Sequence, residues 1–188
     1  MFNQQRAQAS NRGSSTRTAF DDGRANTSAA ELVQFISFTI GDDHYGVDII
    51  AVREIKGWSE IAHLPGQPAY VRGVLNLRGT IVPVIDLRCR FGQGMTEPTP
   101  LHVLVVVLIG EQLVGLLADS VSDIVAVDPA GIKPVPRVAQ HEGAGILSGI
   151  ATVDGKMIAL IDLDRLLTAS DAEAVVAAAA TPVPGAAA

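Results

Sequence analysis

Aromatic residues make up only 4% of this 188-residue chain, and the sequence contains a single cysteine, Cys89. So few aromatic rings leave almost no platforms on which nucleic-acid bases could stack. One cysteine excludes an intramolecular disulfide framework and is typical of a reducing cytosol. The net charge is −6, with Arg and Lys scattered along the chain, so the sequence offers no basic surface for a phosphate backbone.

Long hydrophobic runs are also missing. The longest strongly apolar run, residues 101–109, is about half the length of a membrane span. The N-terminus has no apolar core of the kind found in secretory signals. We therefore expect a soluble cytoplasmic protein that does not insert into a membrane.

Familiar catalytic motifs are absent: the sequence has no GxSxG elbow, no HExxH and no P-loop. Cys89 lacks metal-ligand spacing and the four histidines lie far apart, so we predict no catalytic residue, metal or cofactor. His102 falls in the apolar run and is interpreted as a core histidine. Asp86 and Asp162 each precede a leucine at a strand end, which favours helix N-capping over acid–base catalysis.

The two ends of the chain differ in composition from the middle. Residues 1–30 have almost no large apolar side chains, so they cannot bury enough surface to offset their ordering entropy. We predict a disordered N-terminal tail over residues 1–30 and an Ala/Pro-rich tail over residues 171–188. Residues 31–170 are predicted to form one folded domain.

The folded region carries the same pattern twice. Residues 40–55 align with residues 109–124 without a gap, and residues 73–87 align with residues 149–163. We interpret this as two similar halves of roughly seventy residues, related by an approximate two-fold axis. The identical pairs are Ile40/Ile109, Gly41/Gly110, Gly46/Gly115, Val52/Val121, Ile55/Ile124, Gly73/Gly149, Gly79/Gly155, Ile85/Ile161, Asp86/Asp162 and Leu87/Leu163.

Short apolar or alternating stretches, separated by glycine-centred turns, indicate an all-β sandwich or barrel with short helices. A short helix is expected after Leu87. A longer helix is predicted over residues 162–169, with leucines on one face. The predicted strands include residues 34–40, 45–49, 73–77, 80–85, 101–109, 150–153 and 156–161.

One hairpin turn differs between the two halves. Asp154 precedes the turn glycine in the second half, whereas Arg78 holds that position in the first. Arginine tolerates a positive φ poorly, although a type I turn ending at a left-handed Gly79 would relieve the problem. Arg78 is therefore either retained for function at a local cost or a solvated turn residue.

Several motifs in the chain belong together. Residues 72–79 read RGVLNLRG and residues 82–87 read VPVIDL, with YGVDI at 45–49, VREI at 52–55 and VSDI at 121–124. In order and spacing they resemble the CheW family of bacterial chemotaxis coupling proteins, over about residues 32–168. The resemblance implies two intertwined five-stranded SH3-like barrels related by a pseudo-two-fold axis, with a hydrophobic core between them and a C-terminal helix.

The same resemblance implies a non-enzymatic adaptor that joins the cytoplasmic tips of methyl-accepting chemoreceptors to a CheA-type histidine kinase. It pairs Glu54 with Arg78 near a groove between the halves. Kinase contacts are implied at the outer end of the first barrel, without assigned residues. The implied receptor contacts that line the groove are Val52, Gly73, Gly79 and Val121.

Two other classes of function stay open. A small-molecule-binding β-barrel would need an apolar pocket with a few convergent polar groups. A hydrolase would need a nucleophile and a base within hydrogen-bond reach, and no histidine is placed to suggest one. The adaptor is the favoured hypothesis.

Overall fold

The computed structural model describes residues 31–136 and 144–167, so both predicted tails lie outside the described residues. Within these ranges the chain is mainly β, as predicted, with a few single-turn helices. The strands are β1 (Val33–Ile40), β2 (Asp43–Asp48), β3 (Val52–Gly57), β4 (Val71–Leu77), β5 (Thr80–Asp86), β6 (Val103–Ile109), β7 (Gln112–Ala118), β8 (Ser120–Val127), β9 (Leu147–Val153) and β10 (Lys156–Ile161). The helical turns are η1 (Ile49–Ala51), α1 (Leu87–Arg90), η2 (Pro129–Gly131), η4 (Ala144–Ile146) and α2 (Leu163–Leu166).

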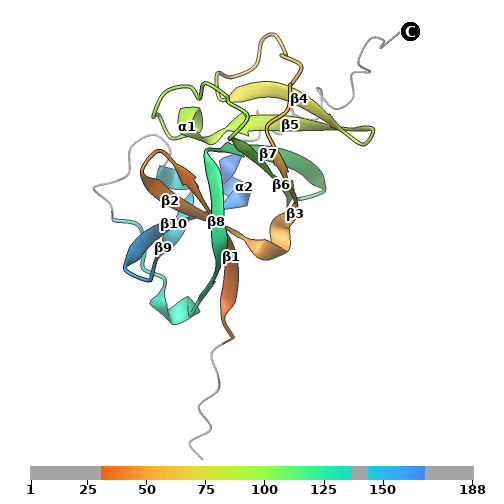
Figure 1. The fold of residues 1–188 in the computed structure, drawn as a ribbon. Helices are drawn as coiled ribbons and strands as arrows, with labels where there is room; N and C mark the ends of the chain where they lie inside the picture. Colours follow the sequence, from red (N-terminus) through yellow and green to blue (C-terminus); the bar gives the residue numbers. More distant parts are fainter. Residues whose placement is uncertain (1–30, 137–143, 168–188) are drawn as a thin grey trace, which may run out of the picture.

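The strands form two five-stranded sheets that exchange strands between the halves (Figure 1). Sheet A has the order β8-β1-β2-β10-β9, and sheet B has the order β3-β6-β7-β5-β4. The sequence repeat makes β1 to β5 equivalent to β6 to β10. Replacing every strand by its equivalent converts one order into the other, so the intertwined, pseudo-symmetric arrangement is confirmed.

Both sheets curl so that their two edges approach each other. The chain that leaves edge strand β3 pairs with the opposite edge strand β4, through the two backbone hydrogen bonds of Ala62 with Val74. The chain that leaves β8 pairs with β9 in the same way, through Lys133 and Ile150. These equivalent bridges are consistent with the predicted barrels.

Hydrophobic side chains form three buried clusters. Each curled sheet encloses one cluster. The members are Phe35, Val127, Ala151, Ile158 and Leu160 in sheet A, and Leu75, Val84, Leu104 and Leu117 in sheet B. The third, the central cluster, joins the two sheets, as the predicted core between two barrels requires. It consists of Ile36, Phe38, Ile40, Tyr45, Val47, Ile85, Leu87, Val105, Val107, Val114, Leu116, Ala118, Ile146, Ile161 and Leu166.

The predicted longer helix over residues 162–169 is wrong within the described residues. Helix α2 is a single turn, no longer than α1. The Asp162 side chain gives it no capping hydrogen bond and instead pairs with Arg165 at 3.1 Å. Leu167 returns to extended backbone and packs against the central cluster, so tertiary packing ends the helix. Asp86, in contrast, caps α1 as predicted, accepting the Cys89 N–H.

Gly73 and its repeat equivalent Gly149 are required where the curled chain crosses a strand. A Cβ atom on Gly73 would lie 2.1 Å from the carbonyl oxygen of Ala62, and the φ of Gly73 is +139°. A Cβ atom on Gly149 would lie 2.5 Å from Ile132 Cγ2 and 3.0 Å from the carbonyl oxygen of Lys133. Only glycine therefore allows the chain to cross β4 and β9 so closely.

We expect Gly73→Ala to lower the free energy of unfolding by at least about 2 kcal/mol, because the new methyl group displaces the Ala62 backbone. Urea unfolding followed by circular dichroism measures the loss. Gly131→Ala is the matched control, since a Cβ there meets nothing within 4 Å. Equal, small effects of the two substitutions would contradict this account of Gly73.

Candidate functional site

Glu54 and Arg78 form an ion pair, as the family resemblance implies. Arg78 Nη2 lies 3.2 Å from Glu54 Oε2, with side chains 82% and 27% exposed respectively. Glu54 lies on edge strand β3, and Arg78 lies in the turn that joins β4 to β5 at the opposite edge of sheet B. The contact therefore spans the gap that the curled sheet leaves between its edges.

Arg78 adopts a positive φ, so the turn is not the type I turn that would have relieved this strain. Arg78 has φ +52° and Gly79 has φ +92°, which matches Asp154 at +50° and Gly155 at +76° in the other half. Two central residues at positive φ are characteristic of type I′ hairpins, for which arginine is a poor residue. The Gly79 N–H donates to Asn76 Oδ1 at 2.7 Å, which helps to hold the turn. Strain of this kind marks a position where function can outweigh local preference.

Val52 and Val121 are half-buried and both pack against the margin of the central cluster. Each is followed by a β-bulge at the equivalent place in its half. In β3 the extra residue is Arg53, and in β8 it is Ser122. A bulge bends an edge strand and redirects the side chains beside it. Both predicted valines thus lie where an edge strand turns away from its sheet.

The six predicted site residues do not all form one surface. Glu54, Arg78 and the exposed Gly79 lie together, and Val52 lies beside Glu54 across the bulge. Val121 lies on the edge of the other sheet, at the margin of the same central cluster. Gly73 is buried under the Ala62 backbone, so any influence it has on the site comes through the path of the chain.

Helix α1 carries the single thiol, Cys89, and the buried Asp86 carboxylate caps it. Burial, with a further contribution from Asp86, raises the pKa of the Cys89 thiol, which lowers the fraction of reactive thiolate near neutral pH. The buried Asp86 carboxylate is held by Thr96, whose N–H and Oγ1 each donate at 2.8 Å. No group of three or more potential metal ligands occurs among residues 31–136 and 144–167.

Comparison with known proteins agrees with this architecture. Residues 34–171 match the family model described as a CheW-like domain. The chain belongs to the CheW family. Of the helices that the structure describes, none has the length and apolar character needed to cross a bilayer.

Named CheW proteins match most of the chain. The chemotaxis protein CheW of Rhizobium meliloti is 40% identical over 141 residues, which is 75% of this chain and 91% of the relative. The CheW of Klebsiella aerogenes is 35% identical over 138 residues, 73% and 83% of the two chains. The crystal structure of the scaffolding protein TtCheW from Thermoanaerobacter tengcongensis superimposes with a TM-score of 0.68 and 34% identity, covering 74% of this chain and 90% of that one.

The CheW-like domain contains a polar cluster, centred on Asp119, that sequence reasoning missed. Asp119 Oδ2 accepts from Arg88 Nη2 at 2.6 Å and from the Gly41 N–H at 2.7 Å. Its Oδ1 lies 3.4 Å from His102 Nε2. Gly41 is in the β1–β2 turn of sheet A, whereas Arg88 lies on α1 and His102 just before β6 of sheet B. Asp119 therefore fastens the two sheets together.

The interpretation of His102 as a core histidine within a strand is wrong, because His102 belongs to this polar cluster. The strand predicted from residue 101 begins at Val103, because residues 99–102 form a turn in which the His102 N–H donates to the Thr99 carbonyl oxygen at 3.0 Å; Leu101 is 84% exposed. His102 lies outside it, half-buried, and its Nδ1 accepts the Thr99 N–H at 3.0 Å. The proton of a neutral His102 ring is therefore on Nε2, facing Asp119. No sequence signal marks Asp119: Ile50 occupies its repeat position, but 11 of the 16 pairs between residues 40–55 and 109–124 differ.

We expect Asp119→Ala to lower the free energy of unfolding by about 1.5–3 kcal/mol, since it removes hydrogen bonds to charged and backbone donors between the sheets. Thermal and urea unfolding provide the measurement. Asp123→Ala serves as the control, because among the described residues the exposed Asp123 carboxylate accepts only from the neighbouring Ile124 N–H, and its loss should cost less than about 0.5 kcal/mol. Indistinguishable variants would remove Asp119 from the inter-sheet contact.

Proposed function

We propose that this chain is a non-enzymatic chemotaxis adaptor that couples the cytoplasmic tips of methyl-accepting chemoreceptors to a CheA-type histidine kinase. The single observation that carries the proposal is the Glu54–Arg78 pair at a strained turn, found in a chain that belongs to the CheW family. A scaffold of this type works in the cytoplasm, in signalling arrays beneath the membrane that holds the receptors.

The receptor surface that we propose consists of Val52, Glu54, Arg78, Gly79 and Val121. Two half-buried valines at the margin of the central cluster supply apolar contact, and the ion pair supplies directional charge. Gly73 belongs to the site only indirectly, because it lets the chain cross β4 beside this surface.

The kinase contact that the family resemblance implies is at the outer end of the first barrel, without assigned residues. Receptor and kinase would then use separate surfaces of the same domain. An adaptor of this kind acts through binding free energy, because a receptor state alters the kinase equilibrium only through contacts that differ between kinase states. Repeated contacts in an array strengthen individually weak ones by avidity.

The small-molecule-binding alternative receives less support. The clusters inside sheets A and B fill both with side chains, as small barrels usually are. A depression of about 710 Å³ is large enough for a ligand, but it lies on the outer surface near the start of β1. Its polar groups are carboxylates and the Gln34 amide, so it lacks the varied, convergent polar set of a specific ligand pocket.

The proposal predicts that the purified chain binds both the regulatory domain of its cognate CheA-type kinase and a receptor-tip fragment. Isothermal titration calorimetry at about 50 µM protein detects dissociation constants in the micromolar range. Heat release with both partners is the expected result. A kinase regulatory domain that gives no binding signal under these conditions would contradict the adaptor function.

Arg78→Ala should weaken receptor binding while the fold survives, because its side chain is mostly exposed. In a double-mutant cycle with Glu54→Ala, we expect a coupling of roughly 0.5–3 kcal/mol in receptor affinity. Asp154→Ala places alanine in the equivalent turn of the other half and controls for backbone effects. Strict additivity in both stability and receptor affinity would return Arg78 to the role of a solvated turn residue.

A further inference from the structure

Asn76 lies beside the strained turn that carries Arg78. Leu77 pairs with Thr80 across the β4–β5 hairpin, so the loop consists of Arg78 and Gly79 alone. The Gly79 N–H lies outside the strand pairs, and the Asn76 side chain meets it, with Oδ1 accepting at 2.7 Å. Asn76 is exposed, and its side chain forms no other hydrogen bond with a described residue. Its contribution is therefore made to the turn and not to a core.

The equivalent hairpin of the other half lacks this hydrogen bond. Asp154 occupies the place of Arg78 there, and aspartate tolerates a left-handed backbone better than arginine does. Thr152 occupies the place of Asn76, and no side chain among the described residues accepts from the Gly155 N–H. The side-chain acceptor thus occurs in the half whose turn residue is unsuitable. A residue held in a disfavoured conformation needs surrounding contacts that keep it there.

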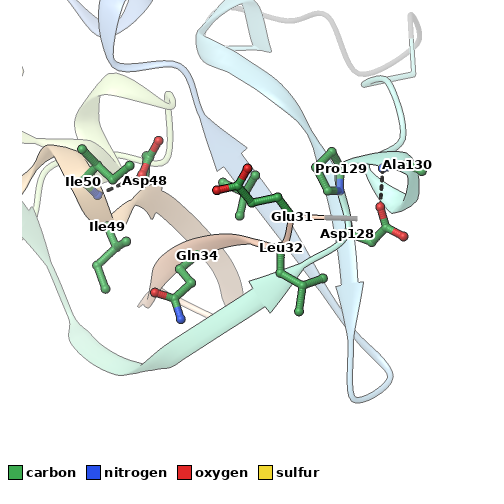
Figure 2. A pocket seen from close by; sticks show the side chains of 10 residues that line it. Glu31, Leu32, Gln34, Asp48, Ile49, Ile50, Asp128, Pro129 and Ala130 are labelled. Atoms are coloured by element: carbon green, nitrogen blue, oxygen red, sulfur yellow. Dashed lines mark hydrogen bonds between the residues drawn. The ribbon is translucent and has the colours of Figure 1, made fainter. Parts of the chain in front are cut away.

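Short polar side chains hold backbone N–H groups at other turns of this chain as well. Asp48 accepts from the Ile50 N–H at η1, and Asp128 accepts from the Ala130 N–H at η2, both at 2.9 Å (Figure 2). Those turns carry no residue of the proposed receptor surface. Asn76 differs from Asp48 and Asp128 because the turn that it holds presents a charged side chain of that surface.

The conformation of the turn decides where the Arg78 guanidinium lies. Arg78 is at one edge of sheet B, and Glu54 is on the strand at the other edge, with 3.2 Å between Nη2 and Oε2. Because the Arg78 side chain is 82% exposed, few packing contacts fix its direction. Its φ of +52° sets the direction of the Cα–Cβ bond. A turn that relaxed to negative φ would redirect that bond and separate the guanidinium from Glu54.

We propose that Asn76 is a positioning residue of the receptor site, because its side chain keeps the turn in the conformation from which Arg78 reaches Glu54. Asn76 acts through Arg78 and has no need to touch the receptor. Its short side chain places an acceptor oxygen within reach of a backbone N–H in the adjoining turn, and aspartate offers the same acceptor. The effect on receptor binding rests on the proposed adaptor function, whereas the effect on Arg78 does not.

The test compares Asn76→Ala with the wild-type chain in two measurements. Isothermal titration calorimetry with a receptor-tip fragment should show affinity weakened by about 3–10-fold, the factor that corresponds to one hydrogen bond. Nitrogen-15 relaxation of the Arg78 Nε–H group, measured without receptor, should show a more mobile side chain. Asn76→Asp keeps the acceptor and should restore both properties.

Two further variants separate positioning from general stability. Asp128→Ala removes a hydrogen bond of the same kind at η2, and it should leave receptor affinity and Arg78 mobility unchanged. In a chain that already carries Arg78→Ala, the substitution Asn76→Ala should cost no further affinity, because the side chain that it positions is gone.

Three results would overturn these expectations in different ways. An Arg78 Nε–H group that is equally fixed in the wild-type chain and in Asn76→Ala would exclude the positioning role, whatever the receptor does. A further loss of affinity in the Arg78→Ala background would show that Asn76 acts on the receptor directly. A wild-type chain that does not bind the receptor-tip fragment would contradict the proposed function, and the relaxation measurement would still decide the role of Asn76 in the turn.

Discussion

The exchange of strands between the two halves is the constraint on which the rest of this structure depends. Strands β1 and β2 form a sheet only with β8, β9 and β10, and β6 and β7 form one only with β3, β4 and β5. The parallel pairings of β2 with β10 and of β5 with β7 join the halves at equivalent registers, Gly46 with Leu160 and Gly115 with Val84. The Glu54–Arg78 contact follows from this exchange, because first-half strands at both edges of sheet B enclose two strands of the second half.

The two halves share their backbone features but differ in the charged residues at equivalent positions. Both halves have the same bulges, the same bridges across a glycine and the same type of hairpin turn. The repeat position of Arg78 is occupied by Asp154 in the other half, and that of Asp119 is occupied by Ile50. Two nearly equal frameworks can therefore present different surfaces, so that the proposed receptor contact forms in one orientation only.

The sequence predicted the repeat and seven of the ten strands that the structure describes, because these follow from periodic apolar residues and glycine turns. The core between two barrels was expected from the family resemblance. The sequence did not predict the one-turn length of α2, because packing of Leu166 and Leu167 decides it. The role of Gly73 depends on Ala62, and that of Asp119 on Gly41, Arg88 and His102. Such contacts join residues far apart in the chain, and no local pattern encodes them.

The strand order also sets a limit on biosynthesis. A ribosome delivers β1 long before β8, which pairs with it, and neither sheet is complete in the first half alone. Sheet A can close only when β10, ending at Ile161, has emerged from the exit tunnel. Nascent β1 and β2 must therefore wait with open edges, which are the features that attract aggregation and chaperones. The intertwined order thus makes closure of sheet A wait for its last strand.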